Sequence, residues 1–160
     1  MDDAVARSIA KWPNVPAVYG WLSLDRRGNW RIKGERIANA ALREFIARNY
    51  EADERGRWYF QNGPQRVFVT LAYTPFVMRY EGERLFDQCG RQVTAKETYV
   101  DDEGSVLILG EHGIGLVDDR DLERYAERAG ELSRIAREQV AARFGFVPNP
   151  SVLPRFEGKS

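Results

Sequence analysis

The stretch Asp25-Arg26-Arg27-Gly28-Asn29-Trp30-Arg31-Ile32 decides how this chain begins to fold. An aspartate at the first corner caps a turn through its own carboxylate, and a glycine at the fourth position supplies the positive φ angle that closes a bulged hairpin. Apolar residues at every second position after the glycine are typical of a strand. The stretch therefore predicts two antiparallel strands joined by a tight turn.

The same phrase occurs twice more, at residues 53–60 and 101–108. The first and third copies both continue to a Gly-Glu pair and then to a segment with helical periodicity. Self-similarity of this kind indicates an internal repeat. We therefore predict two related strand-turn-strand-helix units, over residues 18–50 and 98–130.

Two longer segments have apolar residues at the three- and four-residue spacing of a helix. The first covers residues 35–50, and the second runs from the acidic residues 118–121, which suit a helix N-terminus, to about Phe144. A short helix is also predicted over residues 3–11, before Pro13. Together with the hairpins, these segments predict an α+β fold: an antiparallel sheet of several hairpins with two main helices.

The chain has 160 residues, enough to bury a core without disulfides or a metal. We assign residues 1–145 to a single α+β domain and residues 146–160 to an extended C-terminal segment. Three prolines, at positions 148, 150 and 154, exclude a regular helix there, and its apolar residues favour docking along a groove. The groove belongs either to the same subunit or to a second copy, so a monomer and a homodimer both remain open.

The composition excludes several classes of protein. Lys and Arg total 24 and Asp and Glu total 24, so there is no net field of the kind that a dedicated nucleic-acid binder has. One cysteine allows no internal disulfide, and no apolar run reaches the roughly 20 residues that span a bilayer. We therefore expect a cytoplasmic protein that does not enter a membrane. No metal is expected, because one cysteine cannot form a thiolate zinc cluster and the acidic residues are not spaced as metal ligands. No cofactor is expected either, because the glycine-rich residues 110–115 match no nucleotide-binding fingerprint.

The first hairpin and the residues after it are basic and aromatic. A ribbon of this kind can follow phosphate groups while an aromatic ring stacks on a base, so nucleic-acid binding through residues 26–36 is one alternative function. On a strand, however, Trp30 points away from Arg31 and Lys33. This favours a tryptophan in the core and basic side chains in solvent. The candidate binding residues are Arg26, Arg27, Arg31, Lys33 and Arg36.

Cys89 and His112 are the only cysteine and the only histidine, and they carry the second alternative, an enzyme. Nucleophilic catalysis would require the thiol and the imidazole to lie within hydrogen-bond reach. They fall in separate predicted loops, and no third residue that would orient them is identifiable. An ordinary thiol and a surface histidine fit the pattern better, so no catalytic residue is assigned.

The order of motifs resembles an uncharacterised bacterial family of the domain-of-unknown-function kind. The resemblance covers roughly residues 17–80 and rests on turn and strand motifs: Asp25-x-x-Gly28-x-Trp30, Asp53-x-x-Gly56-x-Trp58-Tyr59, Pro64-x-Arg66-Val67 and Thr74-Pro75-Phe76-Val77. That family is built from repeated hairpin-helix motifs and is linked to signalling. The resemblance implies a regulatory role but supplies no functional residues. We therefore predict a non-enzymatic regulatory or binding domain that contacts a protein partner or a small ligand.

Overall fold

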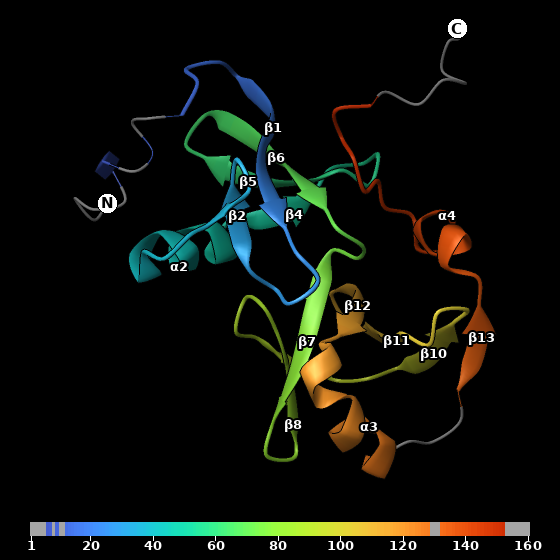
Figure 1. The fold of residues 1–160 in the computed structure, drawn as a ribbon. Helices are drawn as coiled ribbons and strands as arrows, with labels where there is room; N and C mark the ends of the chain where they lie inside the picture. Colours follow the sequence, from blue (N-terminus) through green and yellow to red (C-terminus); the bar gives the residue numbers. More distant parts are fainter. Residues whose placement is uncertain (1–5, 8, 10–11, 129–131, 153–160) are drawn as a thin grey trace, which may run out of the picture.

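The computed structural model describes residues 6–7, 9, 12–128 and 132–152. Its strands form two mixed sheets (Figure 1). The first sheet has the order β3-β2-β1-β6-β5-β4 and the second β13-β10-β11-β12-β7-β8-β9. The first sheet contains β1 (Ala17–Leu24), β2 (Trp30–Ile32), β3 (Glu35–Arg36), β4 (Tyr50–Ala52), β5 (Trp58–Asn62) and β6 (Gln65–Leu71). The second contains β7 (Phe76–Glu81), β8 (Arg84–Asp87), β9 (Gln92–Val93), β10 (Glu97–Asp101), β11 (Val106–Gly110), β12 (Gly113–Val117) and β13 (Ser133–Ile135).

Both sheets follow one topological rule. Each contains two antiparallel three-stranded meanders, and the first strand of the earlier meander pairs in parallel with the last strand of the later one. The second sheet has one more strand, β13, which pairs in parallel with β10. In the first sheet this parallel pair is β1 with β6, and in the second it is β7 with β12. The α+β class is thus confirmed, but the single antiparallel sheet is corrected to two mixed sheets.

The strand order bears on the predicted repeat. Residues 18–50 form β1-β2-β3 and a helix, and residues 98–128 form β10-β11-β12 and a helix, so the order of elements agrees. Their places in the sheets differ, because β1 lies at the central parallel pair and β10 lies beside β13 near an edge. Superposition of the two units stays a prediction, and the shared pairing of meanders relates the two sheets instead.

The helices are shorter than the periodicity predicts. The first, α2 (Ala40–Arg48), begins at residue 40 because Glu35 and Arg36 pair with β2, and Asn39 then caps the helix by accepting a hydrogen bond from the N–H of Leu42 at 2.9 Å. The prediction over residues 3–11 falls mostly outside the described residues.

The predicted helix from 118 to 144 is wrong. The structure has instead a 3-10 turn at Asp119–Asp121, the helix α3 (Leu122–Arg128), the strand β13, a second 3-10 turn at Arg137–Gln139 and the helix α4 (Val140–Phe144). Three residues of β13 pair in parallel with β10, and Ile135 buries its side chain there. Sheet pairing and burial outweigh the local helical preference of this segment.

Aromatic side chains fill the junction between the two sheets. The ring of Tyr50 contacts Trp30 edge-on, with centroids 4.9 Å apart, and also contacts Trp58 and Phe76. Its hydroxyl donates to the carbonyl of Pro75 at 2.7 Å, which fixes the link between β6 and β7. Figure 1 shows this link as the continuous path from one sheet to the other.

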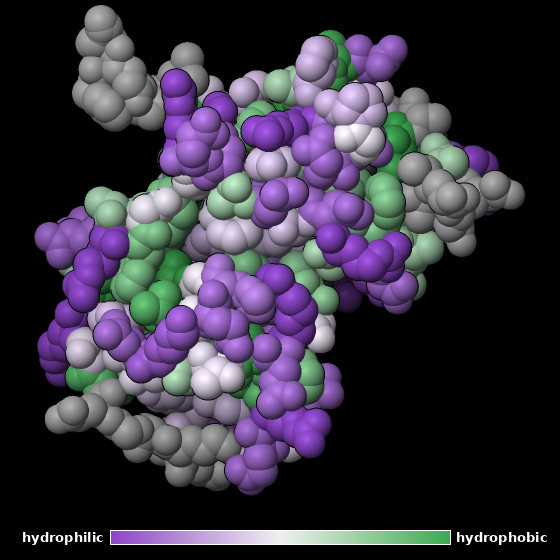
Figure 2. All heavy atoms as spheres, turned by 180° about the vertical axis from the view of Figure 1, so that it is seen from behind, coloured by the Kyte–Doolittle hydropathy of each residue, from purple (hydrophilic) through white to green (hydrophobic). Residues whose placement is uncertain are grey.

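The C-terminal segment docks on its own chain where it is described. Phe146 is buried, the N–H of Val147 donates to the carbonyl of Gly56, and the carbonyl of Pro148 accepts from the N–H of Leu71. Val152, which the sequence also predicts to dock, is 60% exposed, and Leu153 and Phe156 lie outside the described residues. Seen from behind (Figure 2), hydrophobic residues gather on the side where α4 and this segment lie, and hydrophilic residues cover most of the remaining face.

Candidate functional site

The Asp-x-x-Gly turn occurs four times in the structure. In each copy the aspartate carboxylate accepts from the backbone N–H groups two and four residues on, and the glycine N–H donates to the aspartate carbonyl. The turns start at Asp25, Asp53, Asp87 and Asp101. The third is not apparent from the sequence pattern, because the strand after it, β9, is only two residues long and shows no alternation. These aspartates hold turns together and are not free for chemistry.

Three of the five predicted binding residues are engaged within the structure. Arg26 donates to the hydroxyl of Ser105 at 3.0 Å and lies over the ring of Tyr73. Arg27 forms an ion pair with Asp119 at 3.3 Å, between two exposed side chains. The guanidinium of Arg31 binds Asp25 at 2.8 Å and the carbonyl of Gly34. The first two arginines therefore join the first hairpin to the second sheet, and the third braces its own turn.

Lys33 and Arg36 lie at a different place, the first in the turn between β2 and β3 and the second in β3. The backbone of Lys33 has a φ of 51°, in the left-handed region that non-glycine residues rarely adopt. Its ammonium group sits 4.7 Å from the centre of the Trp21 ring, within the range of a cation–π interaction. Arg36 is exposed and lines a hollow beside the first turn of α2. The predicted set thus divides into two arginines that link the hairpin to the second sheet, one arginine that braces its own turn, and two cations, of which Lys33 lies over Trp21 and Arg36 lines the same hollow as Trp21.

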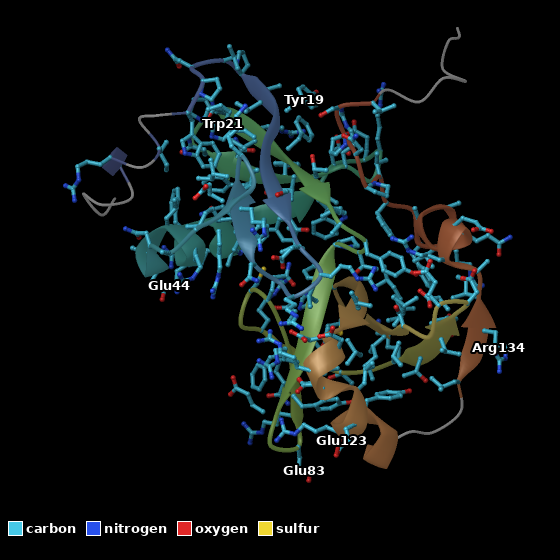
Figure 3. All side chains as sticks on the ribbon, viewed as in Figure 1. Tyr19, Trp21, Glu44, Glu83, Glu123 and Arg134 are labelled. Carbon is cyan, nitrogen blue, oxygen red and sulfur yellow. The ribbon has the colours of Figure 1, made fainter. Side chains whose placement is uncertain are left out.

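A hollow of about 400 Å³ lies between the β1-β2-β3 meander and the first turn of α2. We call it the tryptophan hollow. Most of its lining is apolar. Figure 3 shows that Trp21, which lines the hollow, and Tyr19 point to opposite sides of β1. A register shift between Val18 and Leu22 in β1 separates the two rings. The residues that line the hollow are Trp12, Trp21, Ile32, Glu35, Arg36, Ile37, Ala38, Asn39 and Leu42.

Both tryptophans of the hollow carry an unpaired donor. The indole N–H groups of Trp12 and Trp21 are buried and have no hydrogen-bond partner, although a buried indole N–H usually finds one. Leaving a buried donor unpaired costs about 1–3 kcal/mol. Trp12 itself is only 6% exposed and packs edge-on against Phe60. Two residues with unpaired donors therefore line one mostly apolar hollow, and Trp12 also lines a larger one.

Other hollows on the described surface lack this combination. A larger one, of about 840 Å³, lies between residues 12–16 and 62–65, but its amide groups already bond to the loops. Gln65, for example, donates to the carbonyls of Pro13 and Val15 at 2.6 and 2.7 Å. A polar hollow of about 520 Å³ on the other side of α2 is lined by three arginines, one glutamate and the turns that start at Asp25 and Asp87.

The two residues of the enzyme alternative are not arranged for catalysis. Burial raises the pKa of the Cys89 thiol to about 12, and the nearby Asp87 carboxylate adds to the rise against the opposing charge of Arg91. A catalytic thiol needs the opposite shift. His112 lies exposed in the turn between β11 and β12, and no hydrogen bond between described residues joins it to Cys89. Within the described part of the chain, no group of three or more potential ligands gathers to hold a metal ion.

Two buried carboxylates serve the fold. Asp118 is fully buried, and although burial opposes its charge, hydrogen bonds from the side chain and backbone of Arg120 lower its pKa. Asp121 accepts from the guanidinium of Arg79 at 3.1 Å and from the N–H of Tyr80 at 2.9 Å. These bonds attach the 3-10 turn before α3 to β7, so neither carboxylate is available to a ligand.

Comparison with known proteins gives a family but no activity. Residues 1–145 match the model of a family described as "Protein of unknown function (DUF2946)". The chain belongs to this family. Membership of the DUF2946 family confirms the predicted kinship with an uncharacterised family, and the link to signalling stays a prediction. No curated protein matches this DUF2946 chain, and none of its described helices has the length and apolar character needed to span a bilayer.

Two solved structures of bacterial proteins share its fold. A DUF1285 family protein from Silicibacter pomeroyi DSS-3 superposes with a TM-score of 0.55 at 15% identity, covering 79% of this chain and 85% of the other. A DUF1285 family protein from Shewanella baltica OS155 superposes with a TM-score of 0.53, also at 15% identity, covering 68% of this chain and 92% of the other. At this identity the likeness concerns the fold alone.

Proposed function

We propose that this DUF2946 chain is a non-enzymatic binding domain that takes a small ligand with an apolar body into the tryptophan hollow. The observation that carries the proposal is the pair of unpaired indole N–H groups in an otherwise apolar hollow. Small-molecule sites typically combine apolar walls with a few placed polar groups. A ligand that supplies acceptors would relieve the cost of the two unpaired donors.

The first hairpin gives less support to nucleic-acid binding. Trp30, the ring that would stack on a base, is 2% exposed and packs against Tyr50. Arg26 and Arg27 bond to the second sheet, so phosphate contacts would have to compete with those bonds. A ligand can enter the tryptophan hollow while the Trp30 ring and these two arginines keep their positions.

The enzyme alternative also gains no support from the geometry. The raised pKa of Cys89 keeps the thiol protonated at neutral pH, and His112 lies in a different turn. A binding role needs no such pair. Whether the bound state is passed on to a protein partner, as a regulatory role would require, follows from the proposal only as a further hypothesis.

The test is a titration followed by NMR of the indole N–H groups. The chain has four tryptophans, so ¹⁵N-labelled protein gives four indole signals, which Trp→Phe variants assign. With octan-1-ol as an uncharged apolar probe, we expect the signals of Trp12 and Trp21 to move in a saturable way. The signals of Trp30 and Trp58, which lie in the aromatic junction, should stay in place.

A matched pair of variants locates the binding site. Ala38→Phe adds bulk inside the tryptophan hollow, and Ala47→Phe adds the same bulk to the polar hollow on the other side of α2. We expect Ala38→Phe to abolish the saturable shifts and Ala47→Phe to preserve them. Absence of any shift in the wild type, or equal binding by the two variants, would overturn the proposal.

A further inference from the structure

We infer that the ligand of the tryptophan hollow is an apolar monocarboxylate, an inference that rests on the proposed function. The hollow has donors and cations but few acceptors that face a ligand. Its buried unpaired polar atoms are the indole N–H groups of Trp12 and Trp21, which can only donate. A neutral hydroxyl can accept one of these bonds, but it also brings a donor that needs a partner, whereas a carboxylate only accepts and offers two oxygens.

The rim of the hollow carries the charge that a carboxylate requires. Lys33 holds its ammonium over the Trp21 ring, and Arg36 lines the hollow directly. Glu35 is also at the rim and opposes them, so the three side chains leave one net positive charge. One net charge suits a monoanion better than a phosphate, which carries close to two negative charges at neutral pH.

The position of Lys33 is built into the backbone. Lys33 has a left-handed φ of 51°, and Gly34, the next residue, has a φ of 86°. Together they form the tight turn between β2 and β3, which directs the lysine side chain back over Trp21. The N–H of Lys33 donates to the carbonyl of Trp21 at 2.9 Å, which ties the two residues together. A strained backbone of this kind persists where its surroundings determine it, and it often marks a functional position.

The size and walls of the hollow define the rest of the ligand. About 400 Å³ of mostly apolar space fits a short aliphatic chain or one aromatic ring. Because the two indole nitrogens are buried, a carboxylate in the hollow bonds to them only if the rings turn towards it. The indole signals are therefore a direct readout of where the carboxylate lies.

The experiment compares octanoate with octan-1-ol in the NMR titration, since the two share one chain and differ in charge. We expect octanoate to bind about fivefold more tightly, the factor that corresponds to ~1 kcal/mol for an exposed ion pair. Added salt should weaken the binding of octanoate and leave that of octanol unchanged.

Charge variants then identify the groups responsible. Lys33→Gln and Arg36→Gln should each reduce the preference for octanoate without changing octanol binding, and Glu35→Gln should increase it. Lys96→Gln, which removes an exposed lysine just before β10, is the matched control and should change neither.

The outcomes separate the inference from the proposed function. If octanol and octanoate bind equally, or if Lys33→Gln and Lys96→Gln behave alike, the carboxylate inference is overturned and the binding function stands. If octanoate alone binds and the charge variants weaken it, the inference holds. If neither ligand moves the signals of Trp12 and Trp21, both the inference and the proposed function fall.

Discussion

The turns that start at Asp53 and Asp101 have the same internal hydrogen bonds and different surroundings. At the first, the N–H of Val147 donates to the carbonyl of Gly56, so the C-terminal segment lies against the turn glycine. At the second, nothing approaches within 4 Å of the position where a Cβ on Gly104 would lie. The Asp101 carboxylate instead accepts from the hydroxyl of Tyr73 at 2.8 Å. The phrase thus specifies the turn, and the rest of the chain decides what else the turn supports.

Gly56→Ala should have the largest effect of any single substitution in these turns. The added Cβ would lie against the carbonyl oxygen of Gly145, closer than real Cβ contacts come, and Gly56 has a φ of 81°. Positive φ costs about 1 kcal/mol, and forced displacement of packed backbone costs about 1–3 kcal/mol more. We expect a loss of about 3 kcal/mol or more in the free energy of unfolding, measured by urea denaturation.

Gly63→Ala is the control for that prediction. Gly63 also has a positive φ, 57°, and lies in the turn between β5 and β6, but nothing is within 4 Å of its Cβ position. It should therefore lose only the backbone contribution. If the two variants were equally stable, the C-terminal segment would not lie against the Asp53 turn in solution.

Acid should have the next largest effect, because it protonates several carboxylates whose pKa the fold lowers, including those of two turns. Burial opposes the charge of Asp53, but bonds from the backbone and side chain of Arg57 outweigh it and lower the pKa. Burial likewise opposes the charge of Asp25, and bonds from the Asn29 N–H and Arg31 lower its pKa. Each folded pKa lies below the unfolded value of about 3.9, so the unfolded chain binds protons more readily.

The stability that these two carboxylates contribute is present above the unfolded pKa and is lost as pH falls from there through the folded pKa values. Urea midpoints measured between pH 7 and pH 3 should therefore fall steeply only below about pH 4. Asp53→Asn should flatten that fall, and Asp119→Asn, at an exposed position, should leave it unchanged. A midpoint that is independent of pH in the wild type would contradict the bonding of both turns.

Sequence patterns predicted the turns because the information is local. Three of the four turns are apparent from Asp, Gly and the alternation that follows, and the alternation correctly places Trp30 in the core. The long helix failed for the opposite reason. The apolar spacing that predicts the helix continues past residue 135, and only pairing with the distant strand β10 makes residues 133–135 a strand. Periodicity cannot reveal a partner that lies elsewhere in the chain.

For the candidate site, too, local patterns are readable from the sequence and distant contacts are not. The sequence marks Lys33 and Arg36 as basic residues near an aromatic strand, but it does not separate them from Arg26, whose partner Ser105 is 79 residues away. Neither Trp12 nor Trp21 was selected. A signal was available in Gly20, which has a φ of 71° between Tyr19 and Trp21 and lies where the register of β1 shifts. A glycine inside a strand pattern often marks such an irregularity.

Gly28→Ala should have an intermediate effect. Its φ is 81°, and the added Cβ would lie 3.1 Å from the Cβ of Gln88 and 3.4 Å from that of Val77. These neighbours can yield by a few tenths of an ångström, so we expect a loss of about 2 kcal/mol in the free energy of unfolding. The Asp25 turn meets the Asp87 turn at this point, since Gln88 belongs to the latter.

A double-mutant cycle with Gln88→Gly sharpens that prediction. Removing the Gln88 side chain should make Gly28→Ala less costly, giving a coupling free energy between the two positions. Gln88→Ala keeps the Cβ and removes the same hydrogen bonds to Val77 and Pro75, so it is the matched control and should leave the cost of Gly28→Ala unchanged. Strict additivity in both cycles would show that the two turns do not touch.

Gly104→Ala should have the smallest effect of the series. Gly104 has a φ of 85° and open space around its Cβ position, so only the backbone preference is lost, worth about 1 kcal/mol. Gly90→Ala, in the Asp87 turn, has a φ of 84° and the same open surroundings, and it should lose the same amount. Unfolding free energies of the two variants, measured beside that of Gly56→Ala, complete the comparison. A loss near that of Gly56→Ala would mean that another segment covers the Asp101 turn, and no loss at all would mean that the left-handed glycine is not required there.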